Sequence, residues 1–187
     1  MLVNSNRERL VNAIIFFAAN TKKLGKVKLF KLLYLLDFEH FKLTGRSVTG
    51  LPYYAWEMGP VPQPLYKEWK HPSPDLAAAV DIVTTPVLKF FRDEVVPKVA
   101  FDPSPFTKRQ LDLLQGLAKA YGDKNAEQMV NATHDEFGPW REVWQDGRGK
   151  HQTIPYEMVL DPNDPEDRQL LEGAHEHASI VRQQGYR

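Results

Sequence analysis

The sequence contains no cysteine, carries no net charge and has no apolar run long enough to cross a membrane. Without cysteine there are no disulfides, thiolate metal sites or thiol nucleophiles, which agrees with an intracellular protein. The 24 basic and 24 acidic residues cancel, so no global field draws the chain onto nucleic acid or an anionic membrane. Because the amino terminus also lacks a signal-peptide layout, we expect a soluble cytoplasmic protein.

The motifs of several common enzyme classes are absent as well. There is no glycine-rich phosphate loop, no Gly-x-Ser-x-Gly nucleophile elbow and no dinucleotide fingerprint. His175 and His177 lack the i, i+4 spacing that lets two imidazoles bind one zinc ion from one helix face. We therefore predict no metal, no cofactor and no catalytic residue, and the charge balance argues against nucleic acid as a partner.

The sequence does contain a long apolar segment, which predicts a helix over residues 26–43. On a helical wheel its lysines and Glu39 fall on one stripe and apolar side chains cover most of the rest, so the helix should be buried on nearly all sides. Asp37 projects into the apolar arc, where a carboxylate must be hydrogen-bonded, paired or protonated. It is either a structural tie to another segment, or a general acid or base with His40 or His134 as its partner.

The next segment predicts a helix end, a short strand, a tight turn and a new helix. Gly45 suits the left-handed residue that ends a helix, and residues 53–56 alternate as a strand does. Gly59 and Pro60 are expected to form the turn, and the two prolines just beyond them to open the next helix.

The rest of the chain predicts further helices over residues 5–20, 107–121, 125–133 and 165–184, the last one peripheral because its apolar stripe is thin. A hairpin is expected from two runs, 87–92 and 95–101, around Asp93-Glu94, and it should join the 53–56 strand in one sheet. Five lysines between residues 22 and 31 form either a solvated face or a surface for an acidic protein patch. Trp140 and Trp144, four residues apart, are either core or an exposed anchor.

These patterns predict a mainly α fold of the α+β class. It is a single helical domain around a buried central helix, with a small antiparallel β element. Residues 1–145 should form the domain, and residues 146–187 a carboxy-terminal extension packed on the same domain. At 187 residues, the chain is long enough for one core but not for two independent ones.

Two groups of residues resemble a known family. They are Lys28-x-x-Lys31-Leu32-Leu33-Tyr34-x-x-Asp37 with Gly45-Arg46 and Tyr53-x-Ala55-Trp56-x-x-Gly59-Pro60-Val61-x-x-x-Leu65-Tyr66, and then Thr133-His134 with Pro139-Trp140. Together they resemble the Panacea domain, also called the SocA-like antitoxin domain and described as a phage-associated protein. The chain departs from the pattern at Phe30, where a glutamine is often found, and in a proline-rich stretch after Trp69; both bear on partner choice rather than on the fold.

The resemblance implies an antitoxin that neutralises a cognate toxin protein by direct binding, and it raises a role in phage defence. It also implies, as an alternative, an adaptor that delivers the toxin to a protease. A third interpretation is an enzyme that reverses a toxin-made modification with Asp37 and a histidine. We predict the non-enzymatic antitoxin, with Asp37, His134 and Gly59 as buried or structural residues. The predicted partner-binding residues are Lys28, Lys31, Tyr54, Trp56, Pro60 and Trp140.

Overall fold

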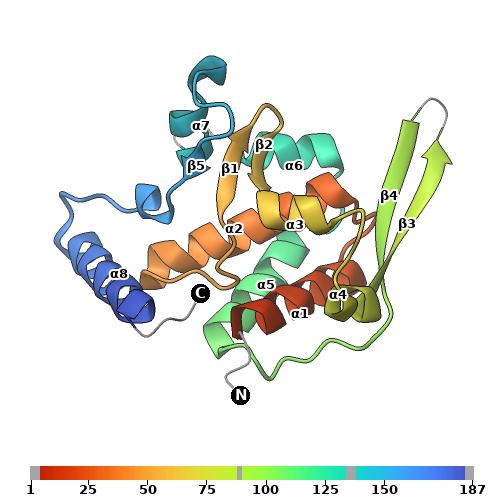
Figure 1. The fold of residues 1–187 in the computed structure, drawn as a ribbon, viewed down its shortest axis with the longest axis horizontal. Helices are drawn as coiled ribbons and strands as arrows, with labels where there is room; N and C mark the ends of the chain where they lie inside the picture. Colours follow the sequence, from red (N-terminus) through yellow and green to blue (C-terminus); the bar gives the residue numbers. More distant parts are fainter. Residues whose placement is uncertain (1–4, 88–89, 134–137, 184–187) are drawn as a thin grey trace.

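Helix α2 (Lys26–Thr44) runs through the middle of the molecule, and the other elements surround it (Figure 1). The structure, a computed structural model, describes residues 5–87, 90–133 and 138–183. Leucine and phenylalanine side chains of α2 are buried on several sides of the helix. Only its carboxy-terminal part carries exposed residues, among them Glu39 and Lys42. The prediction of a mainly helical fold around a buried central helix is therefore confirmed.

Helices α1 (Ser5–Asn20), α5 (Lys108–Tyr121) and α6 (Ala126–Thr133) pack against α2. A capping box begins α5, at the start of the helix predicted over residues 107–121: Gln110 N–H donates to the Thr107 hydroxyl, and Thr107 N–H donates to the Gln110 side-chain oxygen. Gly45 ends α2 in the left-handed conformation, with φ of 67°. Local capping chemistry thus sets these helix boundaries.

A small antiparallel sheet lies over one side of α2, with the strand order β2-β1-β5. Its strands are β1 (Tyr53–Trp56), β2 (Gly59–Pro62) and β5 (Thr153–Ile154). The predicted turn at Gly59 and Pro60 is wrong, because both residues lie in β2 and pair with Trp56 and Ala55. Pro60 is tolerated there because β2 is an edge strand, where a missing N–H costs no ladder bond.

A separate two-stranded hairpin, β3 (Val80–Val87) with β4 (Phe90–Pro97), extends away from the helices (Figure 1). The predicted turn at Asp93-Glu94 is wrong, since these residues lie inside β4 opposite Thr84 and Val83. The hairpin also does not join β1. It is attached instead to the α1–α2 connection, where Val95 N–H donates to the Leu24 carbonyl oxygen over 2.8 Å.

Two short helices, α3 (Gln63–Glu68) and α4 (Pro74–Ala79), connect β2 to the hairpin. The guanidinium group of Arg7, on α1, holds both: it donates to the Glu68 carboxylate over 2.9 Å and to the Asp75 carboxylate over 2.7 Å. The pairing raises the pKa of Arg7 and lowers that of Asp75. The connection is therefore braced against the amino-terminal helix.

The carboxy-terminal part begins with α7 (Pro139–Trp144) and continues through η1 (Gln145–Gly147), β5, η2 (Tyr156–Val159) and α8 (Pro165–Gln183). Ile154 and Leu160 are buried. Helix α8 lies on the outside, beside the end of α2 (Figure 1), and most of its side chains are exposed. No helix in the described ranges is long and apolar enough to cross a membrane.

Candidate functional site

Asp37 is fully buried and tied to the loop that leads from α2 to β1. Its Oδ1 accepts the backbone N–H groups of Val48, over 2.8 Å, and Thr49, over 2.7 Å. Its Oδ2 accepts the Thr49 hydroxyl and the Tyr53 hydroxyl, the latter over 2.8 Å. The carboxylate thus fixes the loop and the first residue of β1 on the central helix.

Within the described residues, Asp37 forms no acid–base pair with a histidine. Burial raises the pKa of Asp37, and the four hydrogen bonds oppose that rise. His40 turns away: its Nδ1 lies 2.6 Å from the Arg46 carbonyl oxygen, and burial lowers its pKa. His134 lies outside the described residues. Since neutral donors surround Asp37, its geometry suits a structural tie.

Lys28 and Lys31 are buried as well, so the solvated face, one of the two alternatives for the five lysines, does not include these two residues. Lys28 Nζ donates to the Gly122 carbonyl oxygen over 2.7 Å and to the Lys22 carbonyl oxygen over 3.0 Å. Lys31 Nζ donates to the Pro60 carbonyl oxygen over 2.9 Å, and burial lowers the pKa of Lys31 to about 7. The end of α5 and strand β2 therefore cover the part of the polar stripe that holds Lys28 and Lys31. A helical wheel cannot show this burial, because the covering segments lie far away in the sequence.

Of the other predicted partner-binding residues, Tyr54 and Trp56 reach the surface, whereas Pro60 and Trp140 are buried, as is Gly59. Trp140 stacks on Trp144 with ring centroids 5.8 Å apart, and its Nε1 donates to the Trp56 carbonyl oxygen over 3.0 Å. Trp140 therefore belongs to the core.

The half-buried Trp56 ring contacts two other rings, those of His151 and Tyr66. Its centroid is 4.8 Å from that of Tyr66, and the Lys26 ammonium lies 5.5 Å from the Tyr66 centroid. Sequence reasoning placed Tyr66 in a motif but not on a surface. Tyr66 and Lys26 in turn line the region between α3 and the hairpin.

A groove of about 940 Å³ opens in that region. Its walls come from the start of α2, from α3 and the loop after it, from α4 and from the hairpin. We call it the hairpin groove; the described residues that line it are Lys26, Tyr66, Lys67, Trp69, Lys70, His71, Pro72, Ala77, Val80, Asp81, Ile82, Thr84, Asp93 and Lys98. Sequence patterns missed it because the hairpin strands were placed in the wrong register.

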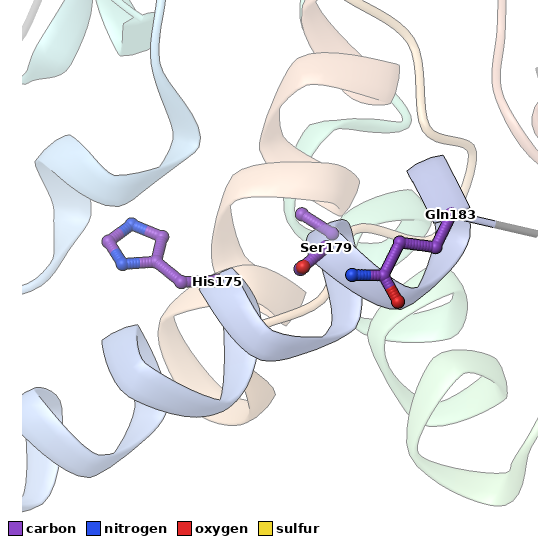
Figure 2. A pocket seen from close by; sticks show the side chains of 4 residues that line it. His175, Ser179 and Gln183 are labelled. Atoms are coloured by element: carbon purple, nitrogen blue, oxygen red, sulfur yellow. The ribbon is translucent and has the colours of Figure 1, made fainter.

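A second hollow, of about 300 Å³, lies along α8 (Figure 2). Its described lining residues are His175, Ala178, Ser179 and Gln183, all from the one helix. A ligand site normally encloses its ligand between several elements, whereas the described residues give this hollow one wall only. Within the described ranges, no group of three or more His, Asp or Glu side chains is placed to hold a metal ion.

Comparison with known protein families gives a match over most of the central part of the chain. Residues 29–141, well over half of the chain, match the family described as antitoxin SocA-like, Panacea domain. The chain belongs to this family. Neither the search of curated proteins nor the search of solved structures found a match. The Panacea domain of this chain takes in most of α2, the β1–β2 pair and the hairpin, so it includes Asp37, Trp56 and nearly all of the hairpin groove.

Proposed function

We propose that this protein is a non-enzymatic antitoxin that neutralises a cognate toxin by binding it directly. Membership of the Panacea-domain family carries the proposal. The protein would then act in the cytoplasm, where a toxin encoded beside it is made, and its biological role would be phage defence.

The surface supports protein binding rather than chemistry on a small molecule. Large apolar side chains are exposed at Met58 (60%), Tyr66 (39%) and Phe91 (76%). Exposed apolar and aromatic groups of this kind occur at protein interfaces. In contrast, the candidate catalytic carboxylate of Asp37 is enclosed by its own loop, so a substrate would have to break that loop away from α2.

The test is a titration of the protein encoded by the neighbouring reading frame. Expression of that protein should arrest growth, co-expression of this chain should relieve the arrest, and the two should purify together. A binder needs about one copy per toxin, whereas an enzyme turns over many toxin-modified targets. Relief by a small fraction of an equivalent, without a stable complex, would refute the proposal and favour the enzyme.

The adaptor alternative has one observation in its favour, which is that α8 lies on the outside with most side chains exposed. If α8 docks a protease, a chain truncated after Asp161 should still bind the toxin but should no longer shorten its half-life. Pulse-chase measurement of the toxin with the full and truncated chains checks this. Equal half-lives would exclude α8 as the docking element.

A further inference from the structure

The hairpin groove is held open by contacts from the core. Trp69 Nε1 donates to the Asp93 carboxylate over 2.9 Å, which joins the loop after α3 to strand β4. The Trp69 ring packs edge-on against Phe30 of α2, with centroids 5.5 Å apart. At the base of the hairpin Val80 and Val95 are buried. The walls are therefore fixed before any partner binds, which lowers the entropy cost of binding.

The charge in the hairpin groove is unequal. Four lysines line it (Lys26, Lys67, Lys70 and Lys98) against two aspartates. Asp81 lies 3.3 Å from the Lys98 ammonium. Asp93 accepts from Trp69 and, over 2.8 Å, from the Thr84 hydroxyl. No ion pair recorded within the described ranges involves Lys67 or Lys70, so the groove presents excess positive charge.

Apolar groups stand beside these lysines. Tyr66 lies at one end of the groove, where Lys26 covers one side of its ring. Phe91 lies two residues before Asp93 on β4, so its side chain is on the same face of the hairpin, nearer the tip. Together with Ile82, Tyr66 and Phe91 can contact apolar side chains of a partner segment whose carboxylates lie between those apolar side chains.

We propose that the hairpin groove binds an acidic segment of the toxin, with carboxylates meeting Lys67 and Lys70 and apolar side chains meeting Tyr66 and Phe91. The inference rests on the proposed antitoxin function and adds the location and the chemistry of the contact. A nucleic acid is a poorer match, because the two wall aspartates repel phosphates and the chain has no net positive charge to attract a polyanion.

A charge-reversed variant tests the inference. Lys67→Glu with Lys70→Glu should weaken binding of the neighbouring gene product by at least about tenfold at low salt, and the loss should shrink at high salt. The matched control is Lys42→Glu with Lys119→Glu, two exposed lysines in the last turns of α2 and α5. Calorimetric titration should place the control within about twofold of the wild type.

Lysine acetylation, read by mass spectrometry in the free chain and in the complex, gives an independent measurement. Formation of the complex should protect Lys67 and Lys70 but leave Lys42 and Lys119 reactive.

If the wild type binds and both double variants bind equally well, the inference fails while the antitoxin function stands. If the wild type forms no complex, the antitoxin function itself fails. If Lys67→Glu with Lys70→Glu abolishes binding of a labelled 20-nucleotide RNA and leaves toxin binding intact, the groove is a nucleic-acid site and the inference is overturned.

Discussion

Replacement of Asp37 should destabilise the protein in two graded steps. Alanine removes both carboxylate oxygens and leaves two backbone N–H groups and two hydroxyls buried without their acceptor. Each stranded donor costs about 1–3 kcal/mol, and the carboxylate no longer has to be desolvated, which offsets part of the loss. We expect a net loss of about 4 kcal/mol for Asp37→Ala.

Asparagine should cost less because it keeps one oxygen in place. That oxygen can still accept the N–H groups of Val48 and Thr49. The amide nitrogen then replaces Oδ2, and the hydroxyls of Thr49 and Tyr53 must rotate from donating to accepting. All four charge-assisted bonds to the carboxylate become neutral ones, so we expect a loss of about 2 kcal/mol for Asp37→Asn.

Urea unfolding at pH 7, followed by tryptophan fluorescence, measures both values. In thermal unfolding, 2 kcal/mol corresponds to a fall in Tm of about 4–8 °C for a chain of this size. The control is Asp112→Asn, an exposed residue on α5, which should stay within about 0.5 kcal/mol of the wild type. At a temperature where it is folded, Asp37→Asn should still neutralise the toxin. An Asp37→Asn variant with wild-type stability and no protection would refute the structural role and indicate catalysis.

Two further perturbations follow from the buried lysine and from the end of α2. Because the pKa of Lys31 falls from its ordinary 10.5 to about 7 on folding, the unfolded chain binds the extra proton between those values. The free energy of unfolding should therefore rise with pH above 7, by about 1 kcal/mol per unit. Lys31→Met should lack this slope in urea unfolding at pH 6–9, and parallel profiles for the two proteins would contradict the assignment. Gly45→Ala places a Cβ 2.8 Å from the Leu170 carbonyl oxygen at a positive φ, so it should cost about 1–2 kcal/mol and speed trypsin cleavage in α8. The control is Gly116→Ala, which has nothing near its Cβ and should be stabilised by about 0.5–1 kcal/mol. Equal cleavage rates in the two variants would disprove the contact between Gly45 and Leu170.

The helices and the burial of Asp37 could be predicted from the sequence because both are local properties. Capping residues such as Thr107 and Gly45 act within one turn, and the apolar arc around Asp37 is visible on a wheel. The partners of Asp37 could not be identified, since no periodicity shows that residues 48–53 fold back on the helix. The burial of Lys28 was missed for a similar reason, because one of its acceptors, Gly122, lies 94 residues away.

The hairpin shows how a local signal can mislead. Asp93-Glu94 has the composition of a turn, yet the Asp93 carboxylate is satisfied by Trp69 and Thr84, which lets it lie inside a strand. The two residues of β5 are too few for any alternating pattern to be recognised. The hairpin groove depends on these tertiary pairings. Its lysines are visible in the sequence, but their position in one groove could not be predicted from it.

The short strand β5 sets a condition for anyone who transplants this Panacea domain into another protein. The family match stops at Arg141, yet residues 153–154 close the free edge of β1, and the Tyr156 hydroxyl donates to the Leu51 carbonyl oxygen. A fragment trimmed to the matched span would bare a row of unsatisfied main-chain groups and invite strand exchange between copies. Chimaeras therefore need to carry the chain through Leu160, whose side chain is still inside the protein.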